Sequence, residues 1–452
     1  MKKKHKFQFI DLFAGLGGFH MALARLGGEC VFASELKETL RRLYAVNFPG
    51  VPICGDITTI DINSIPEHDV LCAGFPCQPF SHAGKKEGFN DAKGRGNLFD
   101  YICNIAAIHR PRFLFLENVA HLKRHDNGNT WRIMRSKLEA LNYYVPDPPL
   151  LSPHQFGIPQ HRRRIYIICE NMDYGHLEHF SYPEPIENVV CDINTIIDKD
   201  DKNVRPIQQE KRYIIDVWQD FISQLASRGQ IIPSFAILSQ EFGADYDLSP
   251  APAFQSLEQL RGKHGEYGRI IDGNTVDECL EMLPKYARQK ESIELTNWIL
   301  SLIHKSRELY QNNKEWIDEW KTKLDPIPYS RRILEWRCGP DATPTVEDKI
   351  IQFRESVVRF KLPTHVPAFT LQITQAVIFP WVDLPKETVQ PGQPSRGRYI
   401  TLKEIMKLQG MENLKWGDGE WTLGRSSSME ALGNAVNVDM VEMIARRALS
   451  VY

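Results

Sequence analysis

Short apolar runs alternate with amphipathic stretches over the first 170 residues of the chain. The runs, which are rich in β-branched and aromatic residues, cover residues 7–12, 30–33, 70–73, 113–116 and 164–169. The stretches between them have helical length and spacing, as in residues 19–26, 37–47 and 130–141. Near-continuous apolar strands that alternate with helices indicate a parallel sheet covered on both faces. Because ligands bind at the carboxyl ends of such strands, the residues that follow each run are candidates for a functional site.

The pattern changes after residue 171, where a segment rich in proline and aspartate leads into a middle region with few strand signals. Apolar residues recur every three or four positions in 275–324, which predicts helices. A small helical subdomain with its own core is favoured there over an insertion that binds a partner or braces DNA. Segment 390–395 resembles a linker, and helical patterns return after residue 401. The domains expected are 1–170, 171–397 with a helical insertion at about 275–324, and a C-terminal segment at 398–452.

The composition excludes several classes of protein. Of the 452 residues, 42% are apolar and 25% are charged, as in an ordinary globular protein of two or three domains. The 55 basic and 57 acidic residues give a net charge of −2, which excludes a uniformly basic surface but leaves room for a local basic groove. No apolar stretch approaches the roughly 18 residues of a membrane helix. The N-terminus lacks the apolar segment of a signal peptide, so a cytoplasmic location without membrane contact is expected.

The nine cysteines are scattered and form neither a Cys-x-x-Cys pair nor a Cys/His cluster. Neither a disulfide framework nor a metal site is therefore expected, and reduced thiols are the plain interpretation.

The first apolar run leads into a glycine-rich loop that contains Gly15 and Gly17. Glycines at this point allow a tight turn and a close approach to a ligand, although a plain strand-to-helix turn is the alternative. Glu35 follows the second run, where an acid commonly binds ribose hydroxyls, and Asp56 follows the third strand. The chain has no Gly-Lys-Ser/Thr motif and only a partial dinucleotide fingerprint. S-adenosylmethionine therefore fits these acids better than ATP or NAD.

Cys77 follows the run at 70–73, in the sequence Gly-Phe-Pro-Cys-Gln-Pro-Phe-Ser of residues 74–81. A lone cysteine is most often a small buried apolar residue. At the mouth of a parallel sheet, however, a thiol can be exposed and its thiolate stabilised. The polar, glycine-rich segment 82–96 that follows has the composition of a lid.

With these elements the chain resembles the DNA cytosine-5 methyltransferase family of prokaryotic restriction-modification systems. Five motifs occur in the family's order: the loop 13–18, Pro-Cys-Gln at 76–78, Glu-Asn-Val at 117–119, Gln-His-Arg-Arg-Arg at 160–164 and Gly-Asn-Ala-Val at 433–436. Residues 398–411 resemble a sixth, although Met411-Glu412 replaces the usual Phe-Pro ending. The resemblance covers roughly residues 7–170 and 398–440.

The resemblance implies an α/β fold: a Rossmann-like, S-adenosylmethionine-dependent methyltransferase domain with a mixed, mostly parallel seven-stranded sheet. A smaller target-recognition domain with a helical insertion is expected beside it. By the same resemblance, Asn434 brings the C-terminal segment back beside the first strand. The cofactor-binding residues expected from the loop, the acids and the family motifs are Phe13, Gly15, Gly17, Glu35, Asp56, Ile57, Pro76, Leu98 and Asn434.

The resemblance also assigns the catalytic residues. Cys77 would add to carbon 6 of cytosine, which makes carbon 5 nucleophilic towards the methyl donor. Glu117 would bind ring nitrogen 3 and the exocyclic amine, although an N-cap or a surface acid is the alternative. Arg162 and Arg164 would face the active site, to contact the cytosine carbonyl or hold the catalytic loop, while Arg163 points away because side chains alternate along an extended chain.

The expected substrate is a cytosine flipped out of double-stranded DNA. The DNA contacts expected are Gln78, Ser81, Thr370 and Leu371, with a β-turn as the alternative at the last two. Basic residues in the middle region are further candidates for phosphate contacts, although a solvated face is the default for each; they are Arg331, Arg332, Arg337, Arg354, Arg359 and Lys361. A monomer is expected, with a cognate restriction endonuclease acting on the same site without a stable complex.

Three other classes of protein compete with this interpretation. A tRNA cytosine methyltransferase would share the motifs, but the long middle region favours a reader of duplex DNA. An inactive DNA-binding homologue would be expected to lack the Pro-Cys or the Glu-Asn-Val element. A nicotinamide dehydrogenase would leave Cys77 and the arginine triplet unexplained.

Overall fold

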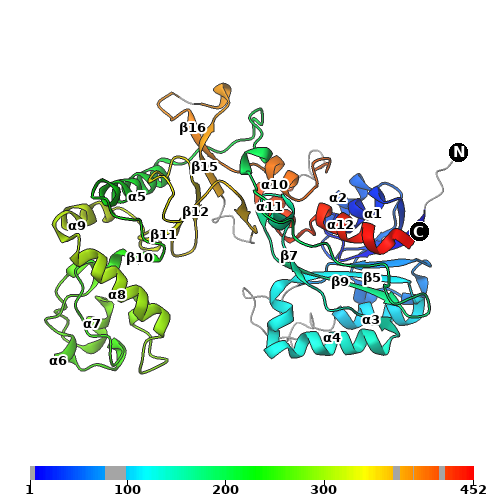
Figure 1. The fold of residues 1–452 in the computed structure, drawn as a ribbon, viewed down its shortest axis with the longest axis horizontal. Helices are drawn as coiled ribbons and strands as arrows, with labels where there is room; N and C mark the ends of the chain where they lie inside the picture. Colours follow the sequence, from blue (N-terminus) through cyan, green and yellow to red (C-terminus); the bar gives the residue numbers. More distant parts are fainter. Residues whose placement is uncertain (1–5, 77–97, 370–376, 390, 417–422, 452) are drawn as a thin grey trace. The chain divides into compact units, whose positions relative to one another are not determined.

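The computed structural model describes residues 6–76, 98–369, 377–389, 391–416 and 423–451, which belong to two compact units (Figure 1). Unit 1 comprises residues 1–198, 364–373 and 401–452, and unit 2 comprises residues 199–363 and 374–400. Within the described residues, no helix is long and apolar enough to cross a membrane.

The core of unit 1 is a mixed sheet whose path has seven strands. Their order is β3 (Ile53–Cys54), β2 (Gly28–Ser34), β1 (Phe7–Leu12), β4 (Val70–Ala73), β5 (Phe113–Val119), β9 (Arg164–Asn171) and β6 (Tyr143–Tyr144). The strands from β3 to β5 are parallel, whereas β9 runs antiparallel to β5 and β6. The expected mixed seven-stranded sheet is confirmed, and β7 (Leu150–Leu151) adds an eighth strand beside β9.

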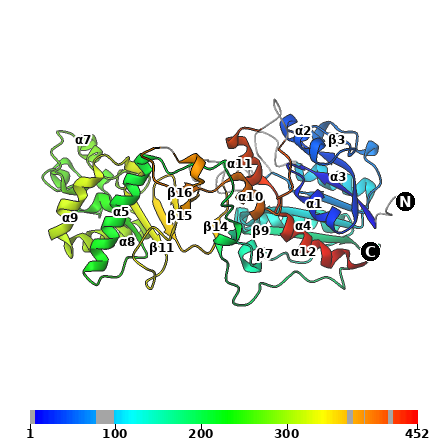
Figure 2. The same ribbon diagram turned by 90° about the horizontal axis from the view of Figure 1, so that it is seen from above.

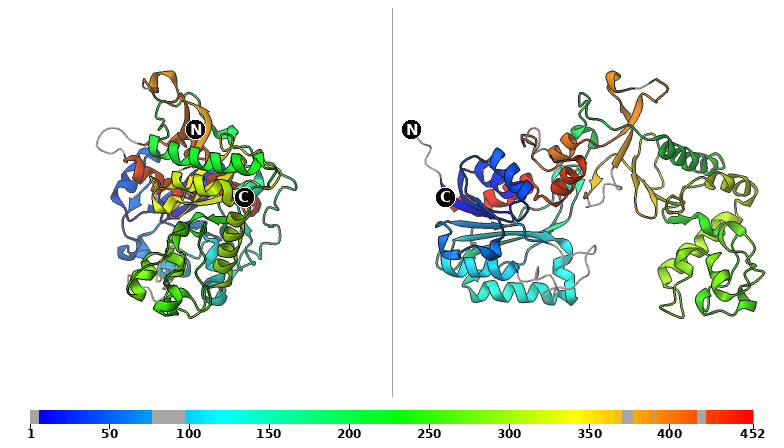
Figure 3. Two further views of the ribbon diagram at one scale, coloured as in Figure 1. Left: turned by 90° about the vertical axis from the view of Figure 1, so that its left-hand side faces the viewer. Right: turned by 180° about the vertical axis from the view of Figure 1, so that it is seen from behind.

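Helices cover both faces of this sheet, as the near-continuous apolar strands predict. The helices α3 (Leu98–His109) and α4 (Asn129–Ala140) lie on one face, and α1 (Gly18–Arg25), α2 (Glu38–Asn47) and α12 (Val438–Ala448) lie on the other (Figure 3). An apolar core is formed between the sheet and the first pair of helices, for example by Leu114, Ile102 and Met134, which are fully buried. All the parallel strands therefore present their carboxyl ends at one edge of a packed scaffold.

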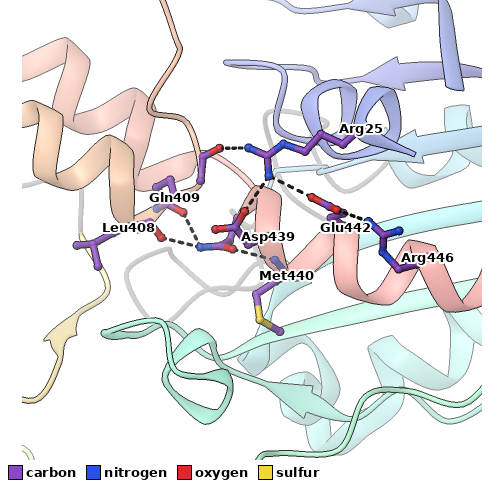
Figure 4. Close-up of polar contacts among 9 residues, drawn as sticks. Arg25, Leu408, Gln409, Asp439, Met440, Glu442 and Arg446 are labelled. Carbon is purple, nitrogen blue, oxygen red and sulfur yellow. Dashed lines mark hydrogen bonds and ion pairs between the residues drawn. The ribbon is translucent and has the colours of Figure 1, made fainter. Parts of the chain in front are cut away.

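The C-terminal segment returns to unit 1 through α10 (Leu402–Leu408), α11 (Arg425–Asn434) and α12, and α12 lies beside α1 (Figure 2). Arg25, in the last turn of α1, donates from Nη2 to the carbonyl oxygen of Gly410 at 2.8 Å. Its Nη1 lies 2.8 Å from Asp439 Oδ1 and 3.2 Å from Glu442 Oε2 (Figure 4). Gly410 has φ +70°, and a Cβ added there would lie 2.7 Å from Asp439 Oδ1. Arg25 thus joins α1 both to the turn that follows α10 and to α12.

Substituting Arg25 by methionine is expected to loosen α12. The change removes two ion pairs and one charged hydrogen bond, a loss of about 1–2 kcal/mol for partly exposed groups. Amide hydrogen exchange in α12 should accelerate by about 5–30-fold, which corresponds to that loss. Arg446→Met is the matched control, because Arg446 pairs only with Glu442 among these residues and is mostly exposed (Figure 4). Equal exchange rates in α12 of both variants would contradict the role of Arg25.

Unit 2 contains a six-stranded sheet and most of the middle region's helices. The strand order is β10 (Ala236–Leu238), β11 (Ile333–Arg337), β13 (Val358–Lys361), β12 (Ile350–Phe353), β15 (Val377–Asp383) and β16 (Arg396–Tyr399). The helices are α5 (Gln209–Ser227), α6 (Leu257–Leu260), α7 (Val276–Glu281), α8 (Asn297–Gln311) and α9 (Lys314–Trp320).

The predicted helices of 275–324 are present, but their core is not confined to that segment. The ring of Trp320 on α9 lies 4.6 Å from Phe221 and 5.3 Å from Trp218, both on α5. Trp298, in contrast, is 67% exposed. The apolar spacing found the helices, whereas their packing against α5 depends on contacts about 100 residues apart.

The units are bounded differently from the expected segments. Unit 1 extends to residue 198 rather than 170, because the connection packs back on it: Ile193 and Ile196 are buried, and Ile186 N donates to Gln155 O at 2.9 Å. Unit 1 also gains residues 364–373, where β14 (Val366–Pro367) pairs with β8 (Gln160–His161). Residues 398–400 fall in unit 2 rather than in the C-terminal segment, because β16 pairs with β15.

Candidate active site

A cavity of about 610 Å³ opens in unit 1 beyond the carboxyl ends of the parallel strands. Its walls come from the loops after β1, β2, β3 and β4, from the end of β5, from β9, and from α11 of the returning C-terminal segment. The predicted site residues that line it are Phe13, Gly15, Glu35, Asp56, Ile57, Pro76, Leu98, Glu117, Arg162, Arg164 and Asn434. Sequence positions that lie up to 421 residues apart therefore meet around one space, as the strand-end argument predicts.

Two acids of the cavity, Glu35 and Asp56, are fixed by hydrogen bonds from residues of the loops that follow β1, β2 and β3. Glu35 accepts hydrogen bonds from the backbone N–H groups of Gly15 at 3.0 Å and Lys37 at 2.8 Å, so its carboxylate links the ends of β1 and β2. Asp56 accepts from Thr58 N at 2.9 Å and from Thr58 Oγ1 at 2.8 Å. Fixed carboxylates of this kind can accept hydrogen bonds from the hydroxyls or amino groups of a ligand.

Gly17 lies next to the cavity rather than on its wall, at the N-cap of α1. Its φ is +80°, and an added Cβ would lie 2.3 Å from the ring of Phe48. Gly17 therefore allows the tight turn that places Phe13 and Gly15 in the wall.

Glu117 on β5 and Arg164 on β9 form what we call the polar floor, which β1 and β4 separate from the strands that Glu35 and Asp56 follow. Glu117 lies near the carboxyl end of β5 and is buried, with Arg164 Nε of the neighbouring strand 3.0 Å from its Oε1. Burial raises the pKa of the Glu117 carboxyl, and the positive charges of Arg164 and Arg162 oppose that rise without cancelling it. The adjacent Asn118 donates to Phe75 O at 3.2 Å, which ties this floor to the segment that leads to Cys77. The floor can thus hold a carboxyl group that takes up a proton more readily than an exposed one.

Arg162 is almost fully buried and reaches the C-terminal segment. Its Nη1 donates to Gly433 O at 2.7 Å and its Nη2 donates to Ala435 O at 2.8 Å. The two carbonyls flank Asn434, so the guanidinium fixes the turn that carries this residue into the cavity wall. The predicted alternation is confirmed: Arg162 and Arg164 line the cavity, and Arg163 is exposed.

Substituting Arg162 by methionine is expected to weaken binding of the ligand that contacts Asn434 by about 10- to 100-fold. Two buried carbonyls lose hydrogen bonds to a charged donor, each worth about 1.5–3 kcal/mol, and the turn shifts. Isothermal titration with S-adenosylmethionine, the ligand expected from the sequence, measures the affinity. Arg163→Met is the control, because it removes the same side chain at an exposed neighbouring position. Unchanged affinity in the Arg162 variant would show that the turn holds without it.

Sequence reasoning missed a second group of lining residues. Leu36 is a 69% exposed apolar side chain directly after Glu35, and Ser427, Glu430 and Ala431 come from α11. The α11 residues lie three, four and seven positions before Asn434, so helical spacing could have found them. Lys37 Nζ lies 2.8 Å from Glu430 Oε1, an ion pair at this wall that no local pattern indicates.

Five predicted site residues lie outside the described residues: Cys77, Gln78, Ser81, Thr370 and Leu371. The predicted lid at 82–96 lies outside them as well. In the described part of the chain, no group of three His, Cys, Asp or Glu side chains is arranged to hold a metal ion, and the eight cysteines there are free thiols.

Comparison with known proteins identifies related sequences and a related fold. The C-5 cytosine-specific DNA methylase family matches residues 7–450. The chain is 39% identical over 277 residues to the type II methyltransferase M.HpaII of Haemophilus parainfluenzae, which covers 61% of this chain and 72% of that protein. It is 44% identical over 180 residues to M.HhaI of Haemophilus parahaemolyticus, which covers 40% of this chain and 54% of that protein. The match thus spans about half of the length of M.HhaI.

Among solved structures, the methyltransferase EhMeth of Entamoeba histolytica aligns over 99% of both chains, with a TM-score of 0.53 and 15% identity. At that identity the likeness concerns the fold alone.

Proposed function

The chain belongs to the C-5 cytosine-specific DNA methylase family and is a DNA cytosine-5 methyltransferase of the restriction-modification type, and we propose that its reaction takes place in the cavity of unit 1. One observation carries this assignment to the cavity. A buried carboxyl with a raised pKa, Glu117, shares a single cavity with two fixed carboxylates, Glu35 and Asp56. A pyrimidine ring needs a protonated carboxyl such as Glu117, and an adenosyl group needs carboxylate acceptors such as Glu35 and Asp56.

The residues of the cavity fit S-adenosylmethionine as the methyl donor. Glu35 and Asp56 offer acceptors for ribose hydroxyls and the adenine amino group, while Phe13, Leu36 and Leu98 offer apolar surface for the purine. Asn434, held by Arg162, would contact the methionine end. When bound, this donor supplies a methyl group on a positively charged sulfur.

The remaining residues act on the base. Carbon 5 of cytosine is a poor nucleophile, so the thiolate of Cys77 adds to carbon 6 and makes carbon 5 electron-rich. Glu117, in its protonated form, donates to ring nitrogen 3 as negative charge develops on the ring. Arg164 orients that carboxyl through the 3.0 Å contact. After methyl transfer, water or hydroxide takes the proton on carbon 5, and the electrons of that bond form the double bond between carbons 5 and 6 as the Cys77 thiolate leaves. Nitrogen 3 then returns its proton to Glu117.

We further propose the biological setting of this activity. The enzyme acts as a monomer on a specific sequence of double-stranded DNA, from which the target base is flipped at a cost of a few kcal/mol. Unit 2 is the target-recognition domain, and Gln78, Ser81, Thr370 and Leu371 contact the DNA. In a prokaryotic cytoplasm, on the nucleoid, methylation would protect DNA from a cognate restriction endonuclease that forms no stable complex with the enzyme.

Methylation of nucleic acids in parallel tests the proposal. The purified protein is incubated with methyl-labelled S-adenosylmethionine and either genomic duplex DNA or tRNA, and bisulfite sequencing then locates the product. Label on duplex DNA, at carbon 5 of cytosines within one short sequence, is expected. Label on tRNA alone would instead identify an RNA methyltransferase, and label on the exocyclic amine would contradict the mechanism.

A further inference from the structure

Three cations of unit 2 come together around two buried rings. Arg205 lies 4.1 Å from the ring centre of Tyr399, and Lys211 lies 5.0 Å from the same centre. Lys211 also lies 5.1 Å from the ring centre of Phe353, and Arg331 lies 5.6 Å from it. The cations come from three places: the approach to α5, its first turn, and the turn before β11. The fold thus brings Arg331 to two like charges that lie more than 100 residues before it in the sequence.

The partners of these cations are neutral. Lys211 Nζ donates to Tyr399 Oη at 2.6 Å, and Arg205 Nε lies 2.9 Å from the side-chain oxygen of Gln208 in the amide orientation that satisfies both ends. Among the described residues, none of Arg205, Lys211 and Arg331 forms an ion pair with a carboxylate. The neighbouring Arg212, by contrast, lies 3.3 Å from Glu347.

Burial and the crowding of like charges both lower the pKa of Lys211. Burial, followed by the charges of Arg205 and Arg331, lowers the pKa of Lys211 to about 8, and Glu210 opposes this only in part. Contacts with ring faces offset part of the repulsion. A bound anion would offset the rest, since it attracts all three cations at once.

We propose that Arg205, Lys211 and Arg331 form a phosphate-binding site and that the phosphate belongs to the backbone of the DNA that the enzyme methylates. The inference rests on the proposed function for the source of the phosphate, whereas the site itself rests on the three cations. Because the rings beneath them are buried, the site offers charge without a surface on which bases could stack. It would therefore position the duplex without reading its sequence. Free polyphosphates share this chemistry, so the test includes one.

The salt dependence of DNA binding tests the site in the full-length protein. Fluorescence anisotropy with a labelled duplex, between about 50 and 200 mM salt, gives the slope of log K against log salt concentration. The double variant Arg205→Gln/Arg331→Gln should lower the magnitude of this slope by about 2, one for each lost phosphate contact. Lys211 is kept, because it bonds to Tyr399 within the unit.

The control variant is Lys314→Gln/Lys323→Gln, which removes the same charge from unit 2. These lysines pair with Asp318 and Asp220 and are about half exposed, so the control should retain the wild-type slope. If the two double variants have the same salt slope, whether that slope is lower than in the wild type or unchanged, the proposal of a phosphate-binding site is overturned. Circular dichroism confirms that both variants are folded.

Chemical labelling of Lys211 identifies the source of the phosphate. At a pH near 8 about half of its amines are neutral, so an amine-reactive reagent should modify Lys211 ahead of lysines with ordinary pKa values. Duplex DNA should protect it. Protection by inorganic tripolyphosphate but not by DNA would overturn the DNA source, and protection by neither would overturn the site. Methylation of the same duplex by the wild-type protein is measured alongside. A protein that binds the duplex through this site without methylating it would contradict the proposed function and not the site.

Discussion

Substituting Cys77 by serine is expected to reduce methyl transfer to duplex DNA by about 10⁴-fold or more. The reaction needs a nucleophile that adds to carbon 6 and later leaves, and a thiolate does both far better than a hydroxyl group. A serine hydroxyl also remains protonated at neutral pH, whereas part of a thiol population is ionised. Radiolabelled methyl transfer under single-turnover conditions measures the chemical step directly.

Binding and fold should survive this change. The variant should bind donor and duplex with affinities close to those of the wild type, because only one atom differs. Cys54→Ser on β3, a half-buried position, controls for the substitution itself and should retain the wild-type rate. A Cys77→Ser protein that methylates DNA at a comparable rate would remove the covalent step from the mechanism.

The second large effect is expected at Glu117, where substitution by glutamine should slow methyl transfer by about 10²–10⁴-fold. Glutamine preserves the shape of the side chain and a hydrogen bond to the base but cannot give up a proton as charge develops on the ring. Its neutral amide also loses the charge attraction to Arg164. The KM for DNA should change much less than kcat, since the lost interaction strengthens only in the transition state.

The pH dependence distinguishes this role from a structural one. Burial raises the pKa of Glu117, so the protonated form persists to higher pH than in a free glutamate. If that form is the active one, kcat falls as the pH rises through the raised pKa, and this fall is absent from the Glu117→Gln profile.

Glu170→Gln is the matched control for Glu117. Glu170 is also buried and lies 2.9 Å from an arginine, Arg112, but it lies at the far end of β9, outside the cavity. Its substitution should lower stability while leaving the pH profile of kcat unchanged. The same loss of the pH-dependent limb in both variants would assign the effect of Glu117 to stability alone.

Much of unit 1 could be predicted from the sequence because its signals are local. Apart from the two-residue β3, each parallel strand is a short apolar run, and acids and glycines that line the cavity follow these runs closely, as Glu35 and Gly15 do. The mixed seven-stranded sheet and the place of Asn434 follow from the resemblance to a family rather than from periodicity.

The contacts that complete the site could not be predicted, because they join distant segments. Arg162 and Gly433 are 271 residues apart, and nothing near either residue indicates the hydrogen bond between them. The same holds for the packing of Trp320 against α5 and for the meeting of Lys211 with Arg331. Of Lys211 and Arg331, only Arg331 is a candidate for a phosphate contact from the sequence alone. Leu36 shows the opposite difficulty, since an apolar residue after a strand gives no local sign that it will be exposed in a cavity.

Trapping the covalent complex tests the central claim most directly. A duplex that carries 5-fluorocytosine at the target position cannot lose the substituent on carbon 5, so the bond to carbon 6 should persist after methyl transfer. Mass spectrometry should find one adduct per protein, containing the added methyl group and mapped to the peptide of Cys77, and none with Cys77→Ser. An active enzyme that forms no adduct, or forms it at another cysteine, would contradict the account.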